Sequence, residues 1–242
     1  MTLARRLLAV PVALVLAGFA LAGCATPVAS APSSSPTDDG GSTEAEVDAA
    51  WLDDGRIIGL VTMGSSGCVP AAEEAVLEDD GSLTVTLVEP DADTVCTTDF
   101  VPRVTLVEVP EGVDPAEDLS ITVTGGGYES STELEGVEGL AGGGMTDYLP
   151  SAGWTSVDGQ FVLLTWGSSS CAPVIAEVAA SAPAEVTVTF QAPPADQVCT
   201  MDMAPRAAVA VVEGLESKTD VELVLTGSPE FADVRVPIYG EN

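Results

Sequence analysis

The sequence predicts an all-β protein made of two tandem small modules, each an antiparallel β-sandwich or barrel-like sheet closed by one disulfide. Three observations predict this fold class. Two motifs return after 103 residues, apolar residues and threonine alternate over strand-length segments, and each copy of the motifs carries two cysteines 28 residues apart. Alternation with a period of two is typical of a strand with one buried face.

The repeat is visible in two pairs of short motifs. GSSGCVP at 64–70 returns as GSSSCAP at 167–173, and VCTTDFVPR at 95–103 returns as VCTMDMAPR at 198–206. Both pairs have the same offset, so no residue is inserted or lost between the two motifs. A period this long exceeds that of a solenoid repeat and predicts two copies of one small domain.

The repeat and the composition divide the chain into five parts. Residues 1–23 read as a signal peptide, and residues 24–50, rich in Pro, Ser, Gly and acids, as a disordered tether. The two β modules are expected at 51–140 and 154–242. The glycine-rich segment 141–153 is expected to link them.

Strands are expected at equivalent places in the two modules. The segments, in the order of the chain, are 56–63, 83–89, 103–109, 119–125 and a short 132–137, then 160–166, 185–191, 206–212, 221–227 and a short 232–238. The sequence EDDGS at 78–82 is a good hairpin turn. Residues 71–76 carry the only hint of a helical turn.

Four cysteines remain after Cys24, in a chain that carries an export signal, and this favours disulfides. Four cysteines allow three pairings. The equal spacing favours one bond within each module, Cys68–Cys96 and Cys171–Cys199. Because a module of this size has a marginal core, such a bond matters for its stability.

The first 24 residues resemble a bacterial lipoprotein signal. Arg5 and Arg6 precede an apolar stretch at 7–21, which ends in the lipobox-like Leu-Ala-Gly-Cys at 21–24. The alternative is an ordinary secretory signal with a chance cysteine. We expect acyl chains, palmitate among them, on Cys24, holding the protein on the outer face of the cell membrane. No other apolar run reaches 18 residues, so no membrane span is expected in the mature chain.

The chain is strongly acidic, with 7 basic and 38 acidic residues and a net charge of −31. Removal of residues 1–23 takes away two arginines and no acid, which brings the charge to −33. Binding to nucleic acid requires a basic surface and is therefore not expected. The charge indicates either simple solubility or attraction of cations and basic partners.

Histidine is absent, which excludes a Ser-His-Asp triad, a Cys-His dyad and any histidine-ligated metal site. The serines at 168–170 therefore lack the usual base, and we interpret the loop as a turn at one end of the disulfide rather than as a nucleophile site. No catalytic residue, metal ligand or cofactor is expected.

Asp99 and Arg103 recur as Asp202 and Arg206. The structural interpretation is an Asp–Arg ion pair beside each disulfide, and the functional one is a clamp for a carboxylate or phosphate ligand. Acidic clusters at 78–80, 89–93 and 114–118 lack the pattern of an EF-hand and read as solvated loops. The three tryptophans fit either the core or a sugar-stacking face.

The second module, with GSSSCAP and CTMDMAP, resembles a group of actinobacterial lipoproteins and secreted proteins that carry a GSSSC-P turn and a later CT-D--P segment. The first copy departs from that pattern at Gly67. The resemblance implies an exported protein with disulfides and implies no activity.

These observations favour a non-catalytic, lipid-anchored envelope protein that binds a partner protein, a wall polymer or a small ligand. The alternatives are a carboxylate-dependent, glycosidase-like hydrolase and a purely structural or inhibitory surface module.

Overall fold

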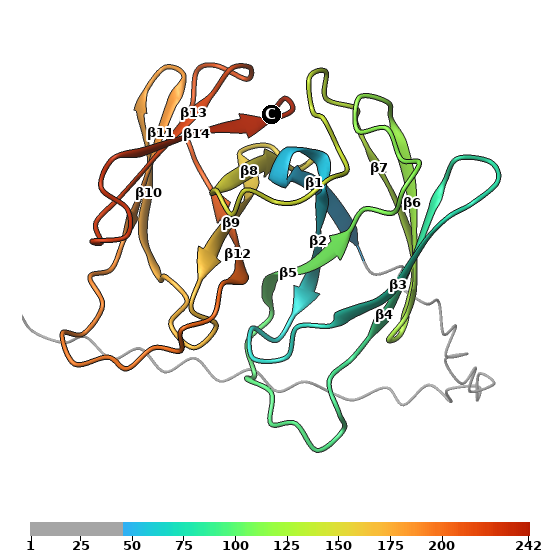
Figure 1. The fold of residues 1–242 in the computed structure, drawn as a ribbon, viewed down its shortest axis with the longest axis horizontal. Coiled ribbons are helices and arrows are strands. Elements are labelled where there is room, and N and C mark those ends of the chain that lie inside the picture. The colour runs from blue at the N-terminus through green and yellow to red at the C-terminus, as the bar shows by residue number, and fades with distance from the viewer. Residues whose placement is uncertain (1–45) are drawn as a thin grey trace, which may run out of the picture. The chain divides into compact units, whose positions relative to one another are not determined.

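The structure is a computed structural model and describes residues 46–242 (Figure 1). The described part of the chain is all-β apart from one short 3₁₀ turn, η1 (Asp53–Gly55). The first module has the strands β1 (Val47–Leu52), β2 (Ile57–Gly64), β3 (Ala71–Leu77), β4 (Leu83–Val88), β5 (Val101–Glu108), β6 (Leu119–Gly125) and β7 (Tyr128–Leu134). The second has β8 (Ser151–Trp154), β9 (Gln160–Gly167), β10 (Ile175–Ala182), β11 (Glu185–Phe190), β12 (Ala204–Val211), β13 (Glu222–Thr226) and β14 (Val234–Tyr239).

The predicted all-β class and the duplication are confirmed by the strand order. In the second module one sheet runs β10-β11-β13-β14-β8-β9-β12 and curves into a half-barrel (Figure 1). The first module has the same order in two sheets, β3-β4-β6-β7 and β1-β2-β5. Most pairs are antiparallel as expected, but β4–β6, β11–β13 and β14–β8 are parallel.

Three expectations were wrong, two about boundaries and one about secondary structure. The segment expected as tether extends too far, because 47–50 belong to β1, whose six residues are all buried. The expected linker likewise includes the start of β8 at Ser151. Residues 71–76 lie in β3 rather than in a helical turn, since pairing with β4 satisfies their backbone groups. The signal peptide, Cys24 and the tether up to residue 45 lie outside the described residues.

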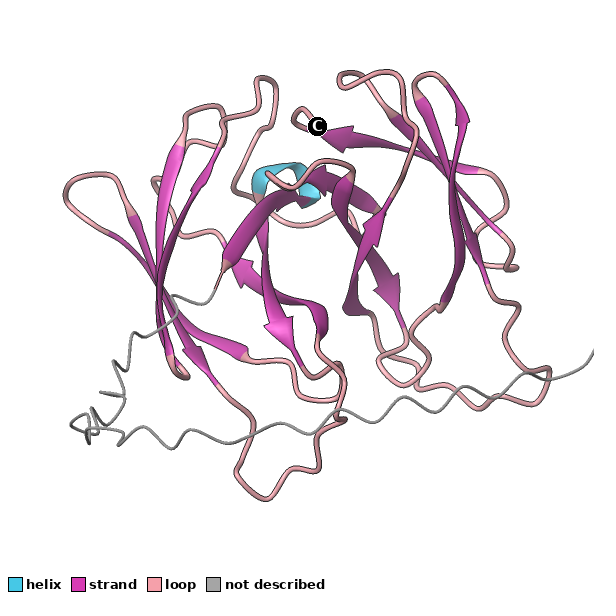
Figure 2. Cartoon of the chain, turned by 180° about the vertical axis from the view of Figure 1, so that it is seen from behind, coloured by secondary structure: helices cyan, strands magenta, loops and turns pink. Residues whose placement is uncertain are grey.

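Each module has its own core, and the two modules share a third. Ile58 and Leu60 of β2 point into the core of the first module, whereas their neighbours Ile57 and Val61 pack against β9 of the second. A strand that is buried on both faces reads as a continuous apolar run, which explains the sequence of β2. The two three-stranded segments, β1-β2-β5 and β8-β9-β12, therefore pack against each other (Figure 2).

The glycine-rich linker is tied to the first module. The backbone amides of Ala141 and Gly142 donate to Asp54, at 3.2 Å to a carboxylate oxygen and at 2.9 Å to the carbonyl. Arg56 donates through Nε to the carbonyl of Gly143 at 2.9 Å. These contacts hold the start of the linker against the first module, and the shared core packs the second module beside it.

Candidate functional site

Two long loops leave the strands at the lower edge of Figures 1 and 2. We call residues 89–100, between β4 and β5, the first cysteine loop, and residues 191–203, between β11 and β12, the second cysteine loop. Cys96 of the first loop is bonded to Cys68, with 5.4 Å between their Cα atoms, and Cys199 of the second to Cys171, with 5.6 Å. Both predicted pairings are confirmed. Since such bonds persist in oxidising compartments, they indicate an extracytoplasmic protein.

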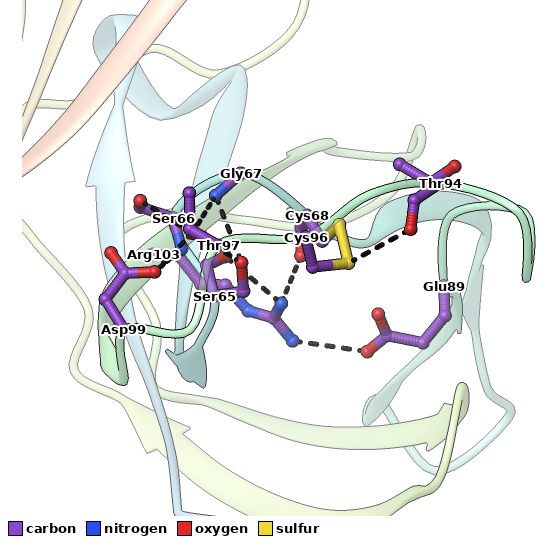
Figure 3. The surroundings of a disulfide bond; sticks show 10 residues. All are labelled: Ser65, Ser66, Gly67, Cys68, Glu89, Thr94, Cys96, Thr97, Asp99 and Arg103. Atoms are coloured by element: carbon purple, nitrogen blue, oxygen red, sulfur yellow. Dashed lines mark hydrogen bonds and ion pairs between the residues drawn. A yellow bond between two sulfur atoms is a disulfide. The ribbon is translucent and has the colours of Figure 1, made fainter.

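The serine turn of the first module is fastened by Asp99 and Thr97 (Figure 3). Asp99 accepts hydrogen bonds from the backbone amide of Ser66 at 3.2 Å and from the hydroxyl of Thr97. The Thr97 hydroxyl in turn contacts the hydroxyl of Ser65 at 2.7 Å and accepts from the amide of Gly67 at 3.1 Å. These donors favour the charged carboxylate and lower the pKa of Asp99.

The second module repeats this network and accounts for the triple serine. Asp202 accepts from the backbone amide of Ser169 at 3.2 Å and from the hydroxyl of Thr200, and these bonds lower its pKa well below the usual value. Ser168 contacts the hydroxyl of Thr200 at 2.8 Å, and Ser170 accepts from the amide of Thr200 at 3.0 Å. All three serines therefore hold the loop, as the structural interpretation expected.

The expected Asp–Arg ion pairs are wrong in both modules. Arg103 lies on β5 with its side chain turned inward, and its guanidinium pairs with Glu89 at 3.2 Å, away from Asp99 (Figure 3). Arg206 pairs in the same way with Glu230. The reason is local: each aspartate precedes the strand and bonds the turn, whereas the alternation of the strand directs each arginine inward.

The sequence reasoning missed Glu89 and Glu230, and the repeat could not reveal them. The residue of the second module that matches Glu89 is Ala192, so the acid reaches the arginine from a different loop in each copy. The arginines also differ in their other contacts. Arg103 donates through Nη2 to the hydroxyl of Tyr128 at 2.7 Å, whereas Nη2 of Arg206 donates to the backbone carbonyl of Trp166 at 2.7 Å.

Each cysteine loop presents large apolar side chains to solvent at matching positions. Val95 is 92% exposed and its counterpart Val198 91%. Phe100 is 73% exposed, its counterpart Met203 58%, and Met201 is fully exposed. Side chains of this kind are normally buried, so their exposure on two equivalent loops that are pinned by disulfides marks a candidate interaction surface.

A cavity of about 480 Å³ lies beside Cys171–Cys199 in the second module. Its walls include Ala172 and Pro173, and Arg206 and Glu230 line it as well. Of the predicted clamp, Arg206 lines this cavity and Asp202 does not, because Asp202 bonds the serine turn instead.

The buried acid Asp53 lies at the junction of the modules. One carboxylate oxygen accepts from the hydroxyl of Thr146 at 3.0 Å and lies 3.6 Å from Arg56. Desolvation raises the pKa of Asp53. Trp51 is buried in the core of the first module and Trp154 in that of the second, at 2% and 4% exposure, as the core interpretation expected.

Within residues 46–242, no three acids or cysteines gather as they would around a metal ion. No helix in this range has the length and apolarity needed to cross a membrane. Comparison with protein-family models, with curated proteins and with solved structures finds no match.

Proposed function

We propose that this protein is a non-catalytic, lipid-anchored binding protein of the cell envelope that holds a partner protein through its two cysteine loops. The observation that carries the proposal is the matched exposure of Val95 with Val198 and of Phe100 with Met203. Apolar side chains at the centre of a contact supply most of its binding free energy.

The two cysteine loops are ordered before binding, so little conformational entropy is lost when these side chains contact a partner. Each is closed by a disulfide and fastened by an aspartate that bonds the serine turn opposite, Asp99 in the first loop and Asp202 in the second. A surface that is ordered before it binds avoids part of the ordering cost of association.

The charge around the apolar side chains specifies the chemistry of the partner. The first cysteine loop carries Glu89, Asp91, Asp93 and Asp99 and no basic residue, and the second carries two acids and no basic residue. An apolar surface with an acidic rim complements an apolar cleft that is bordered by lysine and arginine. The net charge, −33 once residues 1–23 are removed, would further steer a basic partner toward the protein.

The anchor is proposed from the sequence alone. Lipid on Cys24 would tie the chain to the outer face of the membrane, and the polar segment that follows would set the distance to β1. We favour binding over a carboxylate-dependent hydrolase because Asp53, an acid of raised pKa, is buried and uses one carboxylate oxygen to hold Thr146 and Arg56, which is a structural role.

Site-specific photocrosslinking in intact cells tests the proposal. A photoreactive amino acid replaces Phe100 or Met203, and Val157 serves as the control because it is 49% exposed in the turn between β8 and β9. We expect both loop positions to crosslink to the same envelope protein and Val157 not to do so. Equal labelling from Val157, or different products from the two loops, contradicts the proposal.

A further inference from the structure

Two adjoining cavities form a groove between the two modules. The first, of about 450 Å³, lies between the end of β7 and the last residues of the chain, and the second, of about 720 Å³, continues over the end of β14. They share Val137 of the first module and residues 239–241 of the second. We call the two cavities together the junction groove. The chain ends beside it, at the edge opposite the cysteine loops (Figure 1).

The junction groove combines accessible apolar surface with an acidic border. Val137 and Tyr239 are half-buried where the two cavities meet, and Pro237 is exposed. The exposed acids that line the groove are Glu133, Glu135, Glu138, Asp220 and Glu241. Within residues 46–242, no lysine or arginine side chain lines either cavity. The groove therefore offers apolar contact and negative charge together.

The acids of the border receive no counter-charge from the described part of the chain. All five basic residues of 46–242 form ion pairs, and of the acids in the groove only Glu222 is a partner, through Arg235. Lys218 is close along the chain, since its carbonyl accepts from the amide of Asn242, but its ammonium group lies 3.1 Å from Asp158. A concave site lined by one sign of charge concentrates the electric field and attracts the opposite charge.

Charge and shape together specify the ligand. The acids are distributed over both cavities, so several positive charges at intervals suit them better than one ion. Side chains of an extended peptide point alternately to opposite sides, and lysine and arginine can lay their alkyl stems on apolar surface while the charge reaches a carboxylate. We infer that the junction groove binds an extended peptide segment in which lysines or arginines are interspersed with apolar residues.

The inference is independent of the proposed function. The junction groove and the cysteine loops, 89–100 and 191–203, have no residue in common. Either conclusion therefore survives the failure of the other.

The test is an NMR titration of the ¹⁵N-labelled mature chain carrying Cys24→Ser, at about 0.15 M salt to screen unspecific attraction. The probe is the peptide acetyl-KLKLK-amide. We expect saturable shifts of the amide signals of Val137, Tyr239 and Gly240. Acetyl-KGKGK-amide has the same charge without the apolar side chains and should bind about tenfold more weakly. Acetyl-ELELE-amide should not bind.

Matched variants separate the groove from the overall charge. Glu138→Gln with Glu241→Gln removes two charges from the border and should weaken binding of acetyl-KLKLK-amide about tenfold or more. Glu73→Gln with Glu74→Gln removes two charges from exposed β3, outside the groove, and should change it less than about twofold. An unchanged spectrum outside the substituted sites shows that each variant is folded.

The inference is overturned by any of three results. One is the absence of saturable shifts with acetyl-KLKLK-amide, or shifts confined to the cysteine loops. Another is equal weakening by the two pairs of substitutions, which would show that only the net charge attracts the peptide. The third is equally tight binding of acetyl-KGKGK-amide, since the apolar surface would then contribute nothing.

Discussion

The backbone amide of Ser66 donates to Asp99 at 3.2 Å, and 103 residues later the amide of Ser169 donates to Asp202 at the same distance. In both modules a carboxylate therefore fastens the serine turn to the cysteine loop that faces it. This relationship explains why the motifs recur together. The serine turn supplies hydrogen-bond donors to the cysteine loop, and the loop in turn exposes its apolar side chains to solvent.

Substitution of Asp99 by Ala should loosen the first cysteine loop and leave the second unchanged. The amide of Ser66 loses its acceptor, and Thr97 loses the group that orients its hydroxyl. Hydrogen exchange should become faster at residues 65–67, while residues 168–170 of the same molecule serve as the control. Equal rates in the two modules would show that the carboxylate does not hold the turn.

Acidification should release both cysteine loops only at low pH. Hydrogen bonds lower the pKa of Asp99 and Asp202, so their contribution is present above the ordinary pKa of an aspartate and is lost as the pH falls through the lowered value. NMR signals of Ser66 and Ser169 should therefore stay constant down to about pH 4, the ordinary range of aspartate. A transition of these signals between pH 5 and 7 would contradict this assignment.

The stability that depends on Asp53 should change with pH in the opposite direction to that of Asp99 and Asp202, and fall as the pH rises. Burial raises its folded-state pKa, so its contribution is fully present below the pKa of the unfolded chain and is lost as the pH rises through the folded value. Asp53→Asn should remove this loss, so that the stability difference between variant and parent shifts in favour of the variant with rising pH. Urea unfolding of both proteins from pH 3 to 8 measures it. A difference that is constant with pH would be inconsistent with a raised pKa.

Removal of the first disulfide by Cys68→Ser with Cys96→Ser should cost about 3–4 kcal/mol of unfolding free energy on the chain-entropy model, given a loop of 28 residues. Because the modules share a core, the unfolding should remain a single transition. Calorimetry checks both points. A variant in which the first module melts separately would show that the shared core is too weak to couple the modules.

The shared core itself can be tested through Leu164, which is fully buried between the modules. Leu164→Ala leaves a cavity and should cost about 2–5 kcal/mol. Val211→Ala on the exposed end of β12 is the matched control and should change stability by less than about 0.5 kcal/mol. Equal effects of the two substitutions would mean that the modules do not depend on this contact.

The sequence predicted the repeat, the disulfide pairing and most strands, because these depend on spacing and alternation that are read along the chain. It did not predict that β1 starts at Val47, since the segment VDAA carries no alternation and its place in the fold depends on pairing with β2 and on contacts with distant strands. The continuous apolar run from Ile57 to Val61 indicates a strand with both faces buried, and the second face is covered by the other module.

The partners of the two arginines were beyond sequence reasoning for a different reason. Glu89 and Glu230 reach equivalent arginines from loops that do not correspond in the repeat. Only the folded backbone brings them together. The equivalent threonines differ likewise: Thr62 accepts from Nε of Arg103, whereas Thr165 donates to the carbonyl of Arg206, and no motif records this difference.

The central claim, that two equivalent loops bind one partner, is tested most directly by affinity. The protein that crosslinks to Phe100 and Met203 is purified, and its dissociation constant is measured for the parent, Phe100→Ser, Met203→Ser and Val157→Ser. We expect each loop variant to weaken binding by about tenfold or more, as the loss of a central apolar contact does, and Val157→Ser to leave it unchanged. Unchanged affinity in both loop variants would contradict the account.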